Sequence, residues 1–363
     1  MDNRHFPRTA LAQRYLDRLL SLPDRALSIF GPRQIGKTTL LSYDLAELAR
    51  RHGLTPIYVD FMASEDPLLV LLGRLEDRLL DMNSRPGRTA VTRVSAAGFG
   101  LGLAPPPPSA RSADAGVQMQ HCMAAMKRLE PGTRLLLMLD EAQELVRKKD
   151  GERAMKAIRA LFNTYRPDIL LLITGSSREG LLRLFGEHHR ASFGLADHED
   201  FQVMGREFVD FVVEPVNRQL REPLDPAVLG EAFALLGHRP ADFVAYVAEL
   251  VMHPTRDIVG QVPAFLARRY PVEAVRERFE RLTPLQQVLL QLIAGGATRL
   301  TSMATVDAVA ERLGTRVSDA GIRKALASLP SDTLAKPSRG VYEIVDPQLQ
   351  AWLREQIALG RDA

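Results

Sequence analysis

The first two hundred residues alternate between short apolar runs and longer amphipathic segments. Four runs have the length and apolar character of strands, and a fifth is weaker: 25–30, 56–60, 134–139, 169–173 and 200–203. Apolar positions recur at helical spacing up to about residue 52 and over 67–80, 117–129, 153–165 and 178–185. Strands that alternate with helices predict a parallel sheet covered on both faces.

Two breaks in this pattern predict the domain organisation. Residues 83–115 include the run GFGLGLAPPPP, so we expect a loop insertion there. After residue 203 no strand pattern appears, and helical spacing recurs over 207–220, 226–236, 241–251, 258–270 and 272–281. We therefore predict an α/β core over residues 1–205 and a helical segment over 206–278.

The last part of the chain, residues 279–363, changes character again. Thr283 and Pro284 form an N-cap and first-turn pair for a helix to Ala294. Two more helices are predicted at 305–313 and 318–329, followed by a hairpin with strands near 333–336 and 341–345. Three helices and a hairpin are typical of a winged helix-turn-helix.

Composition narrows the class of protein. The 363 residues are 46% hydrophobic and 25% charged, which excludes a largely disordered or fibrous chain. The apolar runs are strand-sized, and the first residues contain no apolar leader segment, so we expect a cytoplasmic protein without a membrane partner. The single Cys122 cannot form an internal disulfide, and no Cys/His cluster has zinc-site spacing.

A phosphate-loop motif joins the first predicted strand to the following helix. Its pattern G-x-x-x-x-G-K-[ST] has the strand-turn-helix context that the motif demands. Backbone N–H groups of such a loop surround phosphates, the lysine reaches the β- and γ-phosphates, and the hydroxyl after it ligates Mg²⁺. The predicted ATP-binding residues are Gly31, Pro32, Arg33, Gln34, Ile35, Gly36, Lys37, Thr38 and Thr39, with Thr38 also a Mg²⁺ ligand.

An acidic pair follows the buried run RLLLML. Asp140 is the expected second partner of Mg²⁺, and Glu141 lies where it could polarise the attacking water. A second set of polar residues, Thr174 to Ser177, follows the run ILLLI at the sheet edge where open α/β sheets bind ligands. Ser176 or Ser177 then reads the γ-phosphate or orients water; alternatively, these serines cap the helix that begins near Arg178.

Four motifs together carry a resemblance to a known family. GPRQIGKTTLL, LLLMLDEAQEL, LLITGSSREGLLRLF and LGHRP occur in the order and spacing of the archaeal-type ATPases of the STAND branch of AAA-like P-loop proteins. The resemblance covers roughly residues 1–255 and continues into a winged helix. It implies a five-stranded sheet of order 5-1-4-3-2 and a helical lid, with ATP and Mg²⁺ as cofactors.

The resemblance also implies three further site residues. Phe6 would be an adenine wall, or part of a tethered N-terminal arm. Pro240 matches the nucleotide-reading Gly-x-Pro motif of the lid, although Gly237-His238-Arg239-Pro240 holds one extra residue. Arg190 would act on the γ-phosphate, across subunits of a homo-oligomer, or else pin a loop; Arg178 competes for this role.

The C-terminal module leaves the partner open. Residues 279–363 hold ten Lys and Arg and nine Asp and Glu, a weak balance for contacting DNA phosphates. Five of these cations lie near the third predicted helix or in the wing: Arg316, Arg323, Lys324, Lys336 and Arg339. They serve either DNA contact or, as we favour, protein interaction or plain domain packing. The predicted function is an ATP-hydrolysing switch that gates an unknown protein partner or an assembly; the alternatives are an ATP-dependent DNA-binding protein and a nucleotide-locked scaffold without turnover.

Overall fold

The computed structural model divides the chain into two compact units. Residues 1–176 and 180–202 form the first unit, and residues 177–179 and 203–363 form the second. The structure describes residues 5–63, 65–84, 108–146, 148, 150–176, 181, 184–185, 193–297, 300, 302–330, 333–338, 341–344, 346–358 and 360.

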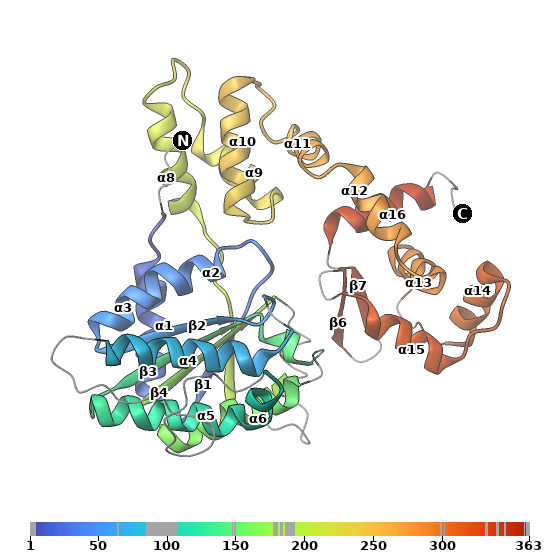
Figure 1. The fold of residues 1–363 in the computed structure, drawn as a ribbon. Helices are drawn as coiled ribbons and strands as arrows, with labels where there is room; N and C mark the ends of the chain where they lie inside the picture. The colour runs from blue at the N-terminus through green and yellow to red at the C-terminus, as the bar shows by residue number, and fades with distance from the viewer. Residues whose placement is uncertain are drawn as a thin grey trace. The chain divides into compact units, whose positions relative to one another are not determined.

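The first unit is built on a parallel sheet of five strands (Figure 1). The strands are β1 (Ala26–Phe30), β2 (Leu54–Asp60), β3 (Arg134–Asp140), β4 (Ile169–Gly175) and β5 (Ala196–Asp200). Their lateral order is β2-β3-β4-β1-β5, which reads 5-1-4-3-2 from the β5 edge. The Asp140 strand therefore lies between β2 and β4, and the strand that precedes the phosphate loop lies between β4 and β5.

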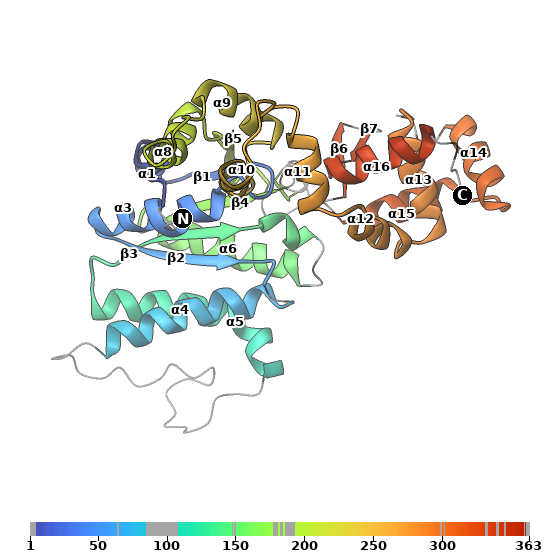
Figure 2. The ribbon, with the colours of Figure 1, turned by 90° about the horizontal axis from the view of Figure 1, so that it is seen from above.

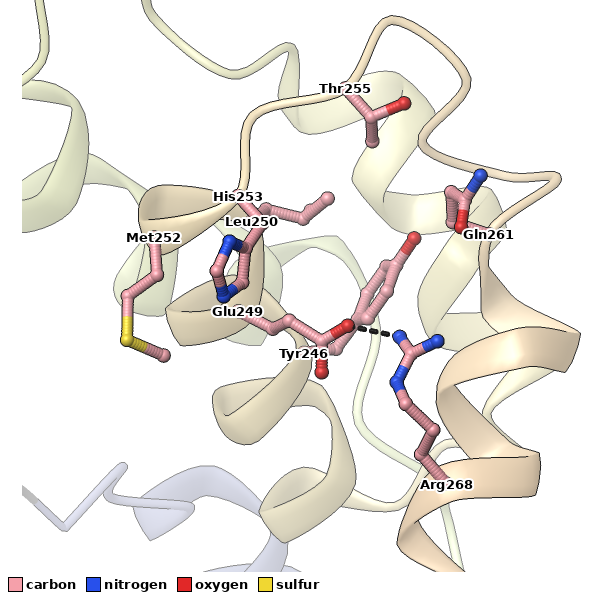
Figure 3. Close-up of a pocket in the computed structure, with 8 residues that line it drawn as sticks. All are labelled: Tyr246, Glu249, Leu250, Met252, His253, Thr255, Gln261 and Arg268. Carbon is pink, nitrogen blue, oxygen red and sulfur yellow. Dashed lines mark hydrogen bonds and ion pairs between the residues drawn. The ribbon is translucent and has the colours of Figure 1, made fainter.

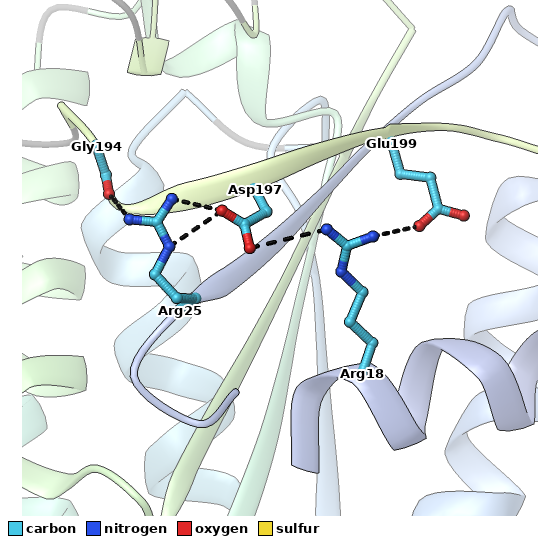
Figure 4. Close-up of polar contacts among 5 residues, drawn as sticks. All are labelled: Arg18, Arg25, Gly194, Asp197 and Glu199. Atoms are coloured by element: carbon cyan, nitrogen blue, oxygen red, sulfur yellow. Dashed lines mark hydrogen bonds and ion pairs between the residues drawn. The ribbon is translucent and has the colours of Figure 1, made fainter. Parts of the chain in front are cut away.

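The fifth strand lies at Ala196–Asp200 and not at the predicted 200–203. Its sequence ADHED is polar because β5 is an edge strand, and of its five residues Ala196 alone is buried. Arginines from the α1 side of the sheet pair its carboxylates: Arg18 reaches Glu199 at 2.9 Å and Arg25 reaches Asp197 at 2.5 Å (Figure 4). This edge strand is thus held by ion pairs and not by buried apolar side chains, so its sequence does not show the apolar pattern that predicts a strand.

Helices cover both faces of this sheet (Figure 2). One face carries α1 (Thr9–Ser21) and the helix after the phosphate loop, which runs as α2 (Lys37–Thr39), a π-helical stretch (Leu40–Leu45) and α3 (Ala46–Arg51). The other face carries α4 (Pro67–Asn83), α5 (Pro108–Leu129) and α6 (Gly151–Tyr165). Successive residues over 135–139 and 169–173 enter opposite cores, so these parts of β3 and β4 are apolar without a break.

Residues 108–115, predicted as the end of a loop insertion, are helical. Helix α5 begins at Pro108 and not near Val117, so the run SARSADAG, which includes the buried Ala115, belongs to this helix. Such a run lacks the large apolar residues that reveal helical periodicity. Residues 85–107, and most of the helix predicted at 178–185, lie outside the described part of the chain.

The second unit is helical at first. It contains α8 (Arg206–Asn217), α9 (Pro226–Leu235), α10 (Pro240–Met252), α11 (Val262–Arg269) and α12 (Val272–Glu280). The rings of Phe208, Phe233 and Phe243 join α8, α9 and α10, with centroids 4.9–5.9 Å apart. These helices begin and end within a few residues of the predicted ones.

The remainder of the second unit has three helices, a hairpin and a final helix. These are α13 (Pro284–Ala294), α14 (Met303–Leu313), α15 (Asp319–Ser328), the antiparallel pair β6 (Leu334–Ser338) and β7 (Val341–Ile344), and α16 (Pro347–Ala358). Thr283 and Gln286 form a reciprocal capping box at the start of α13. Leu289, Ile322 and Leu353 belong to one shared core. Over the described residues, no helix is long and apolar enough to cross a membrane.

Candidate nucleotide site

The phosphate loop adopts a backbone shape that few sequences permit. Gln34 and Gly36 have φ angles of +65° and +92°, in the left-handed region. Left-handed residues within a turn direct neighbouring N–H groups into one concavity, which suits an anion. At Gly31 a Cβ would lie 2.7 Å from both Ile35 Cδ1 and Phe201 Cβ, so this position accepts no side chain. The cradle that phosphates require is thus part of the fold.

Lys37 points back into this loop. Its Nζ donates to the carbonyl oxygens of Gly31 at 2.5 Å and Pro32 at 2.7 Å, and the residue is only 5% exposed. Burial lowers the pKa of this lysine, whereas the nearby charges of Glu141 and Asp140 act to raise it. The buried ammonium therefore lies in the loop near two carboxylates, whose negative charges stabilise it.

Asp140 is the centre of a hydrogen-bond network at the end of β3. Thr38 Oγ1 donates to its Oδ2 at 2.7 Å, and the Tyr58 hydroxyl donates to the same oxygen at 2.9 Å. Its Oδ1 accepts from the Glu141 N–H at 3.0 Å and from the Thr174 hydroxyl. Four donors, from the phosphate-loop helix, β2, β4 and the residue after β3, thus orient a carboxylate that is 2% exposed.

Thr38 and Asp140 fit the magnesium ion that the motif implies. A hydroxyl and a carboxylate are hard oxygen donors, which Mg²⁺ prefers, and Mg²⁺ usually takes one or two protein groups together with phosphate oxygens and water. Within the described residues, no group of three or more His, Cys, Asp or Glu side chains could hold a metal by itself. The donor set therefore suits a metal that arrives with the nucleotide.

Glu141 is held by two neighbours. The Ser176 hydroxyl donates to Glu141 Oε2 at 2.6 Å, and Gln143 Nε2 donates to the same oxygen. The backbone of Glu141 has a φ of +53°, which is unusual for a residue with a side chain. Of the predicted residues at the end of β4, Ser176 thus reaches Glu141, whereas Ser177 lies outside the described residues, as do Arg178 and Arg190.

The N-terminal segment is tethered to the first unit. His5 Nε2 lies 2.7 Å from Asp44 Oδ1, and the Arg8 N–H donates to Asp44 Oδ2 at 3.2 Å. The Arg8 guanidinium lies 4.8 Å from the centre of the Phe201 ring. Phe6, between these anchors, is half-buried, and its role as an adenine wall stays a prediction.

Pro240 is the first residue of α10, in the second unit. Gly237 and His238 just before it have φ angles of +68° and +52°, so the extra residue of this motif is accommodated by a left-handed turn. The contact of Pro240 with nucleotide stays a prediction.

A separate pocket of about 420 Å³ lies in the second unit between α10, the following loop and α11 (Figure 3). Two of its polar contacts are internal: Arg268 binds Glu249, and the Tyr246 hydroxyl donates to the Ile258 carbonyl. It contains no phosphate loop and no residue predicted for the site.

The sequence did not predict three features of this site: Tyr58, Gln143 and the hydrogen bond that Thr174 donates to Asp140. Each had a weak signal, since each is polar and lies at or near the carboxyl end of a strand or just after it. Their contacts depend on the neighbours of β3, which the motifs alone do not specify.

Comparisons with known proteins agree with this geometry. Residues 22–182 match the family described as an AAA domain. A Walker-type ATPase of Pyrococcus abyssi has a similar structure, with a TM-score of 0.61 and 17% identity over 97% of this chain and 99% of that one. The ORC2 protein of Aeropyrum pernix, in ADPNP and ADP complexes, has a TM-score of 0.57 and 18% identity over 99% and 96% of the two chains.

A third similar structure is the ORC1 protein of Aeropyrum pernix in complex with DNA, with a TM-score of 0.51 and 16% identity over 98% and 94% of the chains. At these identities the similarity establishes the fold. The sequence has no detectable relative among curated proteins. Together, the family match over residues 22–182, the fold and the phosphate loop support a P-loop, AAA-like ATPase domain in this part of the chain.

Proposed function

We propose that this protein is an ATP-binding and ATP-hydrolysing switch of the STAND type, in which nucleotide state is passed to a helical lid and a winged helix. The observation that carries the proposal is the network around Asp140. It joins the helix of the phosphate loop to three strands of the sheet through Thr38, Tyr58 and Thr174.

The residues have separate tasks in this proposal. The phosphate loop and Lys37 bind the phosphates, while Thr38 and Asp140 hold Mg²⁺, which when bound would neutralise charge on the β- and γ-phosphates. Glu141 accepts a proton from the attacking water. Ser176 orients Glu141, because its hydroxyl donates to the carboxylate at 2.6 Å.

Coupling to the second unit is supported by Phe201. The α-carbon of Gly31, at the start of the phosphate loop, packs so closely against Phe201 that no Cβ fits between them. Phe201 is one residue from the end of the first unit. A shift of the phosphate loop upon nucleotide binding would therefore act on the segment that leads into the second unit.

The first test is phosphate release by the purified protein. We expect turnover by the wild type, loss of turnover with retained binding in Glu141→Gln, and weaker ATP binding in Lys37→Ala. Binding without turnover by the wild type would favour the nucleotide-locked scaffold. If Arg190 acts on the active site of a neighbouring subunit in a homo-oligomer, the rate of hydrolysis per chain should rise with protein concentration. Mixing Arg190→Ala and Glu141→Gln subunits should then recover some activity.

The alternative function is ATP-dependent DNA binding. It is favoured by the arrangement of α13, α14, α15 and the β6–β7 pair, which supports a winged helix, and by the similarity to an ORC1 protein whose structure contains DNA. Against it stands the weak positive charge of residues 279–363, which leads us to prefer a protein partner. ATPase activity that rises upon addition of duplex DNA would favour the DNA-binding function.

A further inference from the structure

Gln143 occupies an unusual position next to the proposed catalytic carboxylate. It lies in a short 3-10 helix (Ala142–Val146) that directly follows Glu141, and it is 2% exposed. Its side-chain nitrogen donates to Glu141 Oε2 and lies 3.2 Å from Ser176 Oγ. Ser176 in turn donates to Glu141 Oε2 at 2.6 Å. The three side chains therefore form a closed ring of hydrogen bonds.

The protons of this ring are fully assigned by its chemistry. An ionised carboxylate can only accept, so Ser176 directs its single proton to Glu141. The amide nitrogen of Gln143 has two protons, one for Glu141 Oε2 and one for the Ser176 oxygen. Both donors thus bind Oε2, and no described residue donates to Oε1. Oε1 is the oxygen left to accept a proton.

The other end of the Gln143 amide is tightly enclosed. Its Oε1 is buried without a hydrogen-bond partner among the described residues, which is energetically unfavourable for an amide oxygen. It packs against the α-carbon of Gly175, where a Cβ would overlap it. An apolar side chain could fill this space without burying an unpaired acceptor. The placement is therefore explained by what the nitrogen does and not by packing.

We propose that Gln143 is a positioning residue for ATP hydrolysis, which together with Ser176 holds Glu141 so that its Oε1 accepts the proton of the attacking water. This inference rests on the proposed function. In the step concerned, the water oxygen bonds to the γ-phosphorus and its proton goes to Glu141 Oε1. The bond from the γ-phosphorus to the β–γ bridging oxygen breaks, and ADP and phosphate leave.

The test is the substitution Gln143→Met, which keeps an unbranched side chain of similar length but removes the donor. We expect kcat to fall about tenfold to a hundredfold, since the base loses part of its orientation. The KM for ATP, and the ATP affinity measured by calorimetry, should stay within about twofold of the wild type. The matched control is Gln118→Met on α5, another buried glutamine, which should leave kcat unchanged.

A double variant separates positioning from a structural role. If Gln143 acts through Glu141, the variant with both Glu141→Gln and Gln143→Met should hydrolyse ATP no more slowly than Glu141→Gln alone. Losses that multiply would overturn the proposal, and so would a Gln143→Met protein with wild-type kcat.

Two further outcomes are informative. If Gln143→Met does not fold, Gly175→Ala displaces the same amide by overlap, and it should lower kcat while ATP affinity is retained; an unchanged kcat would overturn the proposal. A wild-type protein that binds ATP without turnover would overturn both the proposed function and this inference. Turnover that is lost in Glu141→Gln but kept in Gln143→Met would overturn the role of Gln143 alone.

Discussion

Replacing Lys37 by methionine removes a buried ammonium from the phosphate loop while leaving a side chain of similar length. Two of the three Nζ protons go to the carbonyl oxygens of Gly31 and Pro32, so one remains for a phosphate oxygen without breaking either contact. One charge-assisted hydrogen bond is worth about 1.5–3 kcal/mol. The affinity for ATP should therefore fall by about tenfold to a hundredfold.

The assay is calorimetric titration with ATP and Mg²⁺. Lys156→Met is the matched control, because Lys156 is an exposed lysine of α6 in the same unit and its loss changes the net charge equally. It should bind ATP as the wild type does. An ATP affinity of Lys37→Met within about twofold of the wild type would refute the assignment of the phosphate loop.

The same substitution has a pH signature. Because burial lowers the pKa of Lys37 below its ordinary value of 10.5, the unfolded chain binds more protons than the folded protein between the two values. The stability of the nucleotide-free wild type therefore gains a contribution as pH rises through this window, and Lys37→Met should lack it. Thermal melts of both proteins from pH 8 to 10.5 measure the difference; parallel curves would contradict the burial argument.

Four further predictions concern other residues. Glu141→Gln should bind ATP normally and lose at least about a hundredfold in kcat; wild-type phosphate release would move the proton acceptor elsewhere. Tyr58→Phe removes one of four hydrogen-bond donors to Asp140, so the Mg²⁺ concentration needed for half-maximal ATP binding should rise about threefold to tenfold. An unchanged Mg²⁺ requirement would mean that the Tyr58 hydroxyl does not help Asp140 to bind Mg²⁺. The Arg25 hydrogen bond lowers the pKa of Asp197, so this carboxylate stabilises the folded protein above about pH 4 and loses that effect as pH falls. Asp197→Asn should therefore lower the free energy of unfolding by about 0.5–1 kcal/mol at pH 7 and leave it unchanged near pH 2. Urea unfolding at both pH values measures this difference. Duplex binding through residues 279–363 should show a log–log salt slope no steeper than about −4.5, from at most about five phosphate contacts; tight, sequence-selective binding by this part of the chain would contradict a protein-facing role.

The phosphate loop and the acidic pair were predictable because their signals are local. A strand, a glycine-bounded turn and a helix follow one another within residues 26–51, and the conformation of such a turn depends on the residues within it. Asp140 directly follows the apolar run 135–139 of β3, so its place at the sheet edge follows from the end of that run. The helices of the second unit were predictable for the same reason, since amphipathic spacing is a short-range pattern.

The partners of these residues were decided by the tertiary structure. Tyr58 and Thr174 reach Asp140 because β2 and β4 lie on either side of β3, and strands separated by many residues become neighbours only in the folded sheet. The edge strand β5 was misplaced because its carboxylates are paired by arginines that precede it by more than 170 residues. Gln143 follows Glu141 closely in sequence, yet its contacts with Ser176 and Gly175 require β4. Sequence by itself determined which groups carry charge and chemistry; the lateral order of the strands decided which of them meet, because that order depends on the packing of the whole sheet.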